Sequence, residues 1–334
     1  MKKILFGFYY GIGDFISAVP ILRHLSKKGC YKIIAAVGHQ NRHLTDLLDI
    51  QGIEFFFFSL FSAKSPGGSL SFLKELGRIR PDLIIVSPHP QNNLTSWKVP
   101  FALKTIKLLN PKILVIGALG DRNSFLYDKR VDMQKTDPLM RREIDFARHA
   151  QLIGVHEQVS LENIFKVKPT PGKVISIHAG ASRAAKTWKA ENHASLVRML
   201  LFSYPEYKIK LFGLAHELNG IRQLLEPSEN LEFHICSLRE AVQGVLDSKF
   251  MITMDSGFSH IASALGIRHL VLFGSGDPSL NMPVFPNSEF VFNKVLPCQP
   301  CNLRNCKFEE NRCMDLICPE EVFERVSKIL NEKK

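Results

Sequence analysis

Short apolar runs alternate with longer segments of helical periodicity along the chain. Ile4–Tyr9, for example, predicts a buried strand, and Asp14–Lys28 predicts the helix that follows it, with Pro20 as an unusual residue inside. Strands that alternate with helices of this length indicate β-α-β units and parallel sheets. The predicted strands span residues 4–9, 31–37, 53–58, 83–87, 113–117, 174–178, 209–213, 250–253 and 269–273. The predicted helices span residues 14–28, 42–48, 70–79, 97–108, 144–153, 191–202, 216–225, 238–246, 259–265 and 319–331.

A proline-rich segment separates two halves that repeat this alternation. Residues 167–172 hold two prolines and a glycine, which is typical of a linker, and 334 residues are enough for two domains. We predict an α/β protein with two Rossmann-like, doubly wound parallel-sheet domains facing a cleft, at residues 1–168 and 172–318. A C-terminal helix within residues 319–334 can pack back on the first domain. Ligands of such sheets bind beyond the carboxyl ends of the strands, so the cleft is the expected active site.

Charge and composition narrow the possible partners. The 43 Lys and Arg residues exceed the 32 Asp and Glu residues, for a formal net charge of +11. Such a charge attracts nucleic acid, acidic membrane surfaces or phosphorylated ligands, although a dispersed basic surface without a specific partner explains it equally well. No run of five basic residues and no nucleic-acid motif occurs, so no nucleic-acid partner is expected.

The same composition argues for a cytoplasmic protein. No apolar run approaches the ~20 residues that cross a bilayer. The N-terminus begins like a signal peptide, but Gly11, Gly13 and Asp14 interrupt its apolar segment, and no cleavage site follows.

The first candidate site is the turn Gly11-Ile12-Gly13-Asp14, between the first strand and the first helix. Glycines let the backbone turn tightly and approach a ligand. The dinucleotide pattern G-x-G-x-x-G is incomplete here, because Ser17 and Ala18 stand where a third glycine would help. Asp14 is available as a general base, but it can equally cap the helix or complement its dipole.

Two further glycine-containing turns lie in the second half, each between a strand and a helix. His178-Ala179-Gly180-Ala181-Ser182 offers backbone N–H groups and a hydroxyl, and Lys186 adds a positive charge. This combination suits a diphosphate, with an ordinary loop and one exposed lysine as the alternative. Asp255-Ser256-Gly257 opens the helix that contains His260 and suits the same anion, with a capped helix and a solvated histidine as the alternative.

Five of the seven cysteines lie between residues 298 and 318. Cys298, Cys301, Cys306 and Cys313 begin with a C-x-x-C pair, which is typical of a structural zinc or iron site, but no second such pair follows. Buried reduced cysteines are the alternative. The odd total argues against a disulfide framework.

Taken together, these segments resemble glycosyltransferase family 9, the ADP-heptose:lipopolysaccharide heptosyltransferases. The resemblance covers nearly the whole chain. It rests on Gly11-Ile12-Gly13-Asp14 with Pro20, Gly180-Ala181-Ser182, Lys186-Thr187-Trp188, Phe212-Gly213 with His216-Glu217, Asp255-Ser256-Gly257 with His260-Ile261-Ala262, Pro297-Cys298 through Cys313, and Pro319-Glu320-Glu321-Val322.

The resemblance implies a GT-B fold and inverting transfer that requires no metal or other cofactor. The residue that matches Asp14 is the base that deprotonates the acceptor hydroxyl. The matching donor-site residues hold the diphosphate, sugar and nucleoside, and here they are Gly180, Ser182, Lys186, Gly213, Glu217, Asp255, Ser256, Gly257 and His260. The first domain binds the acceptor, for which Gly13 and Arg122 are candidates. No D-x-D carboxylate pair, which many metal-dependent glycosyltransferases use, occurs in the sequence.

The acceptor is the least determined part of this prediction. Related enzymes carry an Asp-x-Gln-Gly-type segment after the fourth strand, where this chain has residues 86–93 instead. The expected donor is ADP-heptose. The expected acceptor is lipopolysaccharide or another bacterial surface glycan, with peripheral contact at the inner face of the cytoplasmic membrane. Two other classes stay open, an NAD or FAD oxidoreductase with an atypical glycine fingerprint and a non-enzymatic polyanion-binding module.

Overall fold

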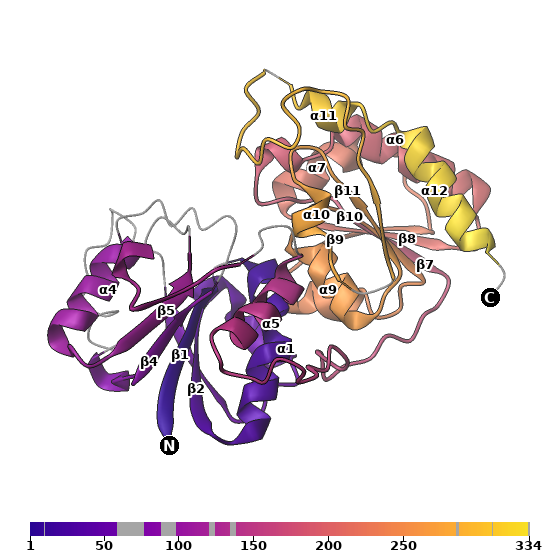
Figure 1. The fold of residues 1–334 in the computed structure, drawn as a ribbon. Coiled ribbons are helices and arrows are strands. Elements are labelled where there is room, and N and C mark those ends of the chain that lie inside the picture. The colour runs from indigo at the N-terminus through magenta and orange to yellow at the C-terminus, as the bar shows by residue number, and fades with distance from the viewer. Residues whose placement is uncertain are drawn as a thin grey trace. The chain divides into compact units, whose positions relative to one another are not determined.

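The computed structural model describes residues 1–9, 11–58, 77–87, 98–119, 124–133, 138–284, 287–308 and 310–332. The chain divides into two compact units, Met1–Ile164 and Phe165–Lys334. Each unit contains one six-stranded sheet with helices packed against it (Figure 1). All of the paired strands run parallel. The prediction of an α/β fold with two Rossmann-like parallel sheets is therefore confirmed.

The first unit has the strand order β3-β2-β1-β4-β5-β6. Its strands are β1 (Lys2–Tyr9), β2 (Tyr31–Gly38), β3 (Ile53–Phe58), β4 (Leu83–Val86), β5 (Leu114–Ala118) and β6 (Lys129–Val131). Its helices are α1 (Ile12–Lys28), α2 (Arg42–Thr45), α4 (Lys98–Leu109) and α5 (Leu139–His149), with short 3-10 turns η1 (His39–Asn41) and η2 (Ser124–Leu126). Apolar strand residues such as Leu5, Ile34 and Val115 are buried in a common core, as their runs predicted.

Helix α1 is the element that carries Asp14 at the end of β1. It continues through the buried Pro20 and stops at Gly29, whose φ of 67° is the left-handed conformation that glycine adopts without strain. The helix packs against α5. Its buried Arg23 donates hydrogen bonds to the carbonyl oxygens of Ser160, Glu162 and Asn163, which anchors the last segment of the first unit.

The second unit has the strand order β12-β11-β10-β7-β8-β9. Its strands are β7 (Val174–His178), β8 (Lys208–Gly213), β9 (Leu231–Ile235), β10 (Phe250–Met254), β11 (His269–Leu272) and β12 (Ser288–Val291). Its helices are α6 (Ala190–Ser203), α7 (Ala215–Gln223), α8 (Leu238–Gly244), α9 (Gly257–Leu265), α10 (Pro278–Asn281), α11 (Arg312–Asp315) and α12 (Pro319–Asn331), with the 3-10 turn η3 (Ala184–Lys186). Counted from the first strand of each unit, both sheets have the Rossmann order 3-2-1-4-5-6.

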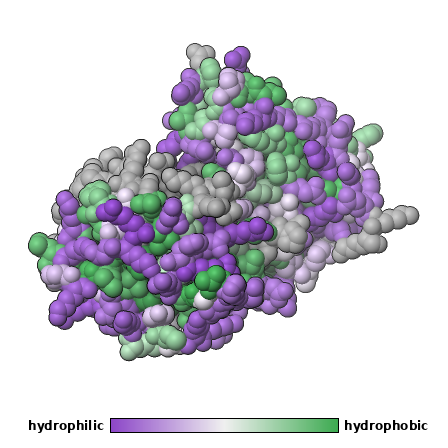
Figure 2. Space-filling model, in the orientation of Figure 1, coloured by the Kyte–Doolittle hydropathy of each residue, from purple (hydrophilic) through white to green (hydrophobic). Residues whose placement is uncertain are grey.

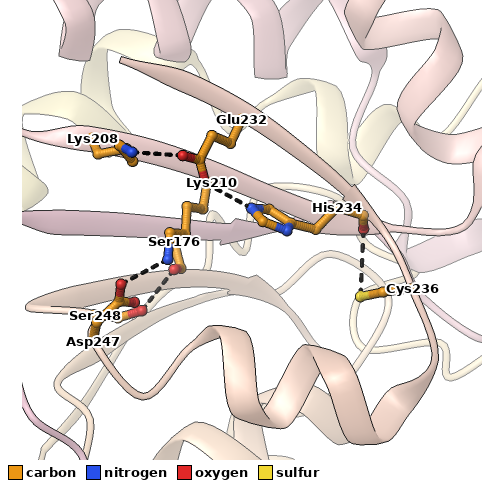
Figure 3. A network of polar contacts seen from close by, with 8 residues as sticks. All are labelled: Ser176, Lys208, Lys210, Glu232, His234, Cys236, Asp247 and Ser248. Atoms are coloured by element: carbon orange, nitrogen blue, oxygen red, sulfur yellow. Dashed lines mark hydrogen bonds and ion pairs between the residues drawn. The ribbon is translucent and has the colours of Figure 1, made fainter. Parts of the chain in front are cut away.

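The sequence patterns missed three strands, β6, β9 and β12, all of which form sheet edges. In β9 the side chains alternate: Leu231 and Phe233 pack on the core of the unit, whereas Glu232 and His234 carry polar groups to the other face (Figure 3). Because only alternate residues are apolar, β9 contains no continuous apolar run.

Polar side chains on β7, β8, β9 and the neighbouring loops contact one another on one side of the sheet (Figure 3). Glu232 accepts from Lys208 at 2.6 Å and contacts the ring of His234 at 3.0 Å. The other contacts shown are Lys210–Asp247 at 2.7 Å, the Ser176–Ser248 hydroxyl pair at 2.6 Å, and the Cys236 thiol with the His234 carbonyl at 3.7 Å. Of these contacts, Lys208–Glu232 joins the side chains of β8 and β9, whose backbones already pair in parallel.

Two predicted helices differ from the observed ones by three or more residues at an end. The helix predicted at 144–153 is α5, which starts at Leu139 directly after Pro138. The one predicted at 42–48 is the shorter α2. Most of the helix predicted at 70–79 lies outside the described residues.

The C-terminal helix α12 lies along α6 within the second unit (Figure 1). Val322, Val326 and Ile329 follow helical spacing and are buried in the core of that unit. The apolar face of α12 is therefore buried in the core of the second unit.

Hydrophilic residues cover much of the face shown in Figure 2, with apolar residues scattered among them. Among the described helices, none is long and apolar enough to cross a membrane.

Candidate functional site

The second sheet has a switch point between its neighbouring strands β7 and β10, where the loops leave in opposite directions. The loop after β7 carries Lys186, and the loop after β10 carries Asp255. The structure brings these two predicted residues together, with Lys186 Nζ 2.5 Å from Asp255 Oδ2. Only 9% and 7% of the two side chains are exposed. A buried ion pair therefore occupies the position where parallel sheets of this order bind ligands.

A third loop completes the surroundings of Asp255. Asn281 Nδ2 lies 3.5 Å from Asp255 Oδ2, and a Cβ atom added to Gly276 would lie only 1.8 Å from the same oxygen. The carboxylate can therefore occupy this position only because residue 276 has no side chain. The sequence reasoning missed both residues, although residues 274–277 repeat the pattern of a glycine-rich turn between a strand and a helix.

Helix α9 begins at the same switch point, directly after Asp255. Ser256 is its N-cap, and its Oγ accepts from the backbone N–H of Phe258 at 3.3 Å. His260 is buried in the first turns of the helix, which ends at Gly266 with a left-handed φ of 77°. The capped helix considered for this motif is present, and its N-terminus adds partial positive charge beside the ion pair.

A second group of predicted residues meets at the ends of β7 and β8. Glu217 Oε2 accepts from the backbone N–H of Leu214 at 2.7 Å. A Cβ atom on Gly180 would lie 2.4 Å from this oxygen, and one on Gly213 would lie 3.0 Å from it. The Glu217 carboxylate thus rests against two positions without side chains. Ser182 is exposed in the loop that leads from here to Lys186.

Two buried histidines lie beside these loops. The ring of His178 stacks on Phe258, with centroids 4.3 Å apart and an interplanar angle of 12°. Burial lowers the pKa of His178 to about 4, although a hydrogen bond with the Gly180 backbone opposes the shift. Burial, and then the nearby His178, lowers the pKa of His193 to about 3. Both rings are therefore neutral at pH 7 and add no positive charge beside Lys186.

In the first unit, Asp14 lies in the corresponding switch region, after β1 and next to β4. Asp14 Oδ2 accepts from the backbone N–H of Gly11 at 3.1 Å. The capping role that the sequence left open is therefore present, and the role of base stays a prediction. Gly13 is buried in the first turn of α1, whereas Arg122 lies outside the described residues.

Three buried polar residues that the sequence reasoning missed lie near Asp14. The Ser87 hydroxyl, just after β4, donates to Glu143 Oε1 on α5. Burial, and then the negative charges of Glu143 and Asp14, raise the pKa of Tyr9 well above its usual value. The sequence offered no local sign of this cluster, because its members come from β1, the end of β4 and α5.

The cysteine segment does not support the predicted structural metal. All seven cysteines are free thiols. Burial, and then the nearby Cys306 and Cys301, raise the pKa of Cys313 to about 11. Within the described part of the chain, no group of three or more His, Cys, Asp or Glu residues is arranged to hold a metal ion. The suggestion of zinc or iron at Cys298, Cys301, Cys306 and Cys313 is therefore unsupported.

Comparison with known proteins points to one family. The family model of glycosyltransferase family 9 (heptosyltransferase) matches residues 70–311. Lipooligosaccharide heptosyltransferase 2 of Campylobacter jejuni is 25% identical over 231 residues, which cover 65% of this chain and 71% of that protein. Lipopolysaccharide heptosyltransferase 1 of Escherichia coli is 30% identical over 107 residues, which cover 32% of this chain and 33% of that protein.

Solved structures of heptosyltransferases share the fold. The E. coli ADP-heptose lipopolysaccharide heptosyltransferase II superimposes with a TM-score of 0.69 at 19% identity, over 99% of this chain and 98% of that one. An E. coli heptosyltransferase solved with ADP gives a TM-score of 0.72 at 16% identity, over 98% and 99% of the two chains. With the family model matching most of the sequence and the GT-B fold matching nearly all of it, the chain belongs to glycosyltransferase family 9, the heptosyltransferases.

Proposed function

We propose that this glycosyltransferase transfers heptose from ADP-heptose to a lipopolysaccharide or related surface glycan, with inversion at the anomeric carbon and without a metal ion. The observation that carries the proposal is the buried Lys186–Asp255 pair at the switch point of the second sheet, beside the N-terminus of α9. In this proposal each unit supplies one part of the reaction, a carboxylate at Asp14 from the first unit and an anion site at Lys186 from the second.

The second unit would bind the donor. Lys186 and the α9 N-terminus are the groups suited to the diphosphate, because both present positive charge in a place shielded from water. Glu217, held against Gly180 and Gly213, offers a carboxylate to the ribose hydroxyls of the nucleoside. A solved relative of the same fold was crystallised with ADP, and another with an ADP-heptose analogue, which favours adenosine as the base.

The reaction is a single displacement. Asp14 takes the proton of the acceptor hydroxyl while the oxygen attacks the anomeric carbon, and the bond from that carbon to the diphosphate breaks. The electron pair leaves with ADP, whose developing charge Lys186 and the α9 dipole stabilise. One displacement without a covalent intermediate inverts the anomeric configuration. Charge from the chain itself takes the place that a metal ion has in metal-dependent glycosyltransferases.

The acceptor is proposed from the relatives and from the charge of the chain. The curated relatives are named as lipooligosaccharide or lipopolysaccharide heptosyltransferases. A net charge of +11 favours a phosphorylated glycolipid at an anionic membrane surface.

Thermal stabilisation by a panel of ADP, UDP, GDP, CDP and NAD, without divalent metal, tests the donor assignment. A ligand present at about 100 times its Kd adds about 2.7 kcal/mol of stability, which shifts the melting midpoint by a few degrees. We expect selective stabilisation by ADP. Stabilisation by another nucleoside diphosphate would change the assigned donor but keep the reaction class. Stabilisation by NAD alone would contradict the proposal.

Incubation with ADP-heptose and heptose-deficient lipopolysaccharide then tests transfer itself. The expected product is a glycan extended by one heptose, with the anomeric configuration opposite to that of the donor by NMR. Retention of configuration would exclude the single displacement.

A further inference from the structure

The cysteine-rich segment, residues 297–318, makes contacts with both loops that surround the Lys186–Asp255 pair. The carbonyl of Arg304 accepts from the backbone N–H of Ala185 at 3.1 Å, in the turn that carries Lys186. On the other side, the backbone N–H of Asn302 donates to the carbonyl of Ser275 at 2.8 Å, next to Gly276. One segment therefore connects the loop of Lys186 to the loop that encloses Asp255.

Asn311 makes the most specific of these contacts. Its Nδ2 donates to the carbonyl of Ala184 at 2.6 Å and to the carbonyl of Thr187 at 3.3 Å, the residues on either side of Ala185 and Lys186. Within the same turn, the backbone N–H groups of Lys186 and Thr187 donate to the carbonyls of Arg183 and Ala184, both at 3.0 Å. A single side-chain amide thus holds both ends of the turn that presents Lys186.

Contacts of neighbouring residues fix the position of Asn311 relative to the turn that carries Lys186. Lys189, just after the turn, pairs with Asp315 at 3.1 Å, one helical turn beyond Asn311. The indole N–H of the buried Trp188 donates to the carbonyl of Ile317 at 2.9 Å. The helix α11 that follows Asn311 is therefore attached to the same stretch of chain as the turn itself.

We propose that Asn311 is a positioning residue for the donor site: it sets the conformation of residues 184–187 and thereby aims Lys186 at the donor diphosphate. The proposal rests on the assignment of Lys186 to the donor, stated above. It gives the cysteine-rich segment a role that needs no metal, because the segment acts through backbone carbonyls and one amide. Asn311 itself need not touch the donor.

Two substitutions of Asn311 separate its hydrogen bonds from its other roles. Asn311→Ala removes both donated bonds. Asn311→Asp keeps the size and suits the N-cap position of α11, but it directs a carboxylate at two carbonyl oxygens. Both variants are expected to weaken ADP binding, measured by calorimetry, by about tenfold. A loss of this size corresponds to roughly one net hydrogen bond. Wild-type ADP affinity in Asn311→Asp would overturn the proposal.

Asn293→Ala is the matched control. Its Nδ2 donates to the carbonyl of Leu316 at 2.9 Å and to Glu321 Oε2 at 2.8 Å, so it also fastens this part of the chain, but away from the Lys186 turn. We expect Asn293→Ala to lower the melting temperature with unchanged ADP affinity. Equal losses of ADP affinity in Asn293→Ala and Asn311→Ala would mean that general loosening of the segment, rather than Asn311, explains the effect.

Two further measurements test whether Asn311 acts through Lys186. In a Lys186→Met background, Asn311→Ala should change the remaining ADP affinity less than twofold, because the group that it positions is gone. A full tenfold loss in that background would contradict the proposal.

Hydrogen exchange tests, without any ligand, whether Asn311 sets the conformation of the turn. The backbone amides of residues 185–187 should exchange faster in Asn311→Ala than in wild type or Asn293→Ala, and unchanged exchange would refute the positioning role. If the wild-type protein binds no nucleoside diphosphate, the proposed donor site fails, while the exchange rates still show whether Asn311 sets the turn.

Discussion

The ammonium group of Lys186 and the carboxylate of Asp255 lie 2.5 Å apart, with only 9% and 7% of their side chains exposed. Removing one partner from such a pair leaves the other charge buried and uncompensated, which costs about 3–5 kcal/mol. We therefore predict that Lys186→Met both destabilises the second unit and strongly weakens ADP binding, without removing it entirely. Urea denaturation and calorimetry measure the two effects.

The double variant Lys186→Met/Asp255→Leu separates stability from function. With both charges replaced by apolar groups of similar size, most of the lost stability should return, whereas ADP binding should stay as weak as in Lys186→Met. Wild-type ADP affinity in the double variant would remove Lys186 from the donor site.

Asp14→Asn should abolish transfer but leave ADP affinity nearly intact. An amide cannot accept the acceptor proton, and general base catalysis contributes roughly 10²–10⁴-fold to rate. The amide oxygen can still accept from the Gly11 N–H, which is 3.1 Å from the carboxylate in the wild type, so the helix start should be preserved. The measurement is kcat with ADP-heptose and heptose-deficient lipopolysaccharide.

Glu240→Gln is the control for this change. Glu240 is the third residue of α8 and accepts from the backbone N–H of Ser237 at 2.8 Å, as Asp14 does at the start of α1. Its substitution should leave kcat unchanged. Retained turnover in Asp14→Asn would eliminate Asp14 as the base.

Gly276→Ala should weaken ADP binding by displacing Asp255. The added Cβ atom would lie 1.8 Å from Asp255 Oδ2, so the carboxylate must move and the pair with Lys186 must open. Gly220→Ala in α7 is the control, because its Cβ atom would meet only Ala190 at 3.5 Å. There we expect a gain of about 0.5–1 kcal/mol, since alanine is favoured over glycine within a helix. An unchanged ADP affinity in Gly276→Ala would show that the position of Asp255 is not required.

The second unit should lose stability as pH falls from about 6.5 toward 4. His178 and His193 have folded pKa values of about 4 and about 3, well below the usual value of 6.5. Between these limits the unfolded chain binds protons that the folded chain does not, so each histidine removes up to about 1.4 kcal/mol of stability per pH unit. Above pH 6.5 both states are neutral and the effect vanishes. Urea denaturation between pH 4.5 and 8 measures the slope.

His193→Leu should flatten this slope at little cost near pH 7. Among the described residues, neither ring nitrogen of His193 has a hydrogen-bond partner, so replacing the ring with an apolar side chain breaks no hydrogen bond. The same acid sensitivity in His193→Leu as in wild type would show that the ring is accessible to protons in the folded state.

Chelation should leave transfer unaffected. Lys186 and the α9 N-terminus supply the positive charge that the proposed reaction requires. Activity measured after treatment with EDTA should equal that of untreated protein, and recovery of a lost activity by Mg²⁺ or Mn²⁺ would contradict the metal-independent mechanism.

The family assignment removes the two alternatives that the sequence had left open. An oxidoreductase was disfavoured by Ser17 and Ala18 in the first glycine turn, and a polyanion-binding module rested on charge alone. Membership of glycosyltransferase family 9 replaces both.

The sequence by itself determined mainly the secondary structure and the positions of the glycine-containing turns. Apolar runs and helical periodicity predicted the two parallel sheets, because side-chain alternation and backbone period act over a few neighbouring residues. Glycine turns after β1, β7 and β10 likewise marked the switch points in advance. The edge strands β6, β9 and β12 were not predicted, because none of them contains more than two consecutive apolar residues.

The tertiary structure decided which of the marked residues meet. Lys186 pairs with Asp255, Glu143 with Ser87, and Asn311 with the turn at residues 184–187, in each case across a long stretch of chain. No local pattern specifies such contacts, because they depend on strand order and on the loops that the order brings together. The same reason applies to the cysteine segment: its spacing resembled a metal site, whereas only the fold shows that Asn311 and backbone groups of this segment contact the turn that carries Lys186 and the carbonyl of Ser275.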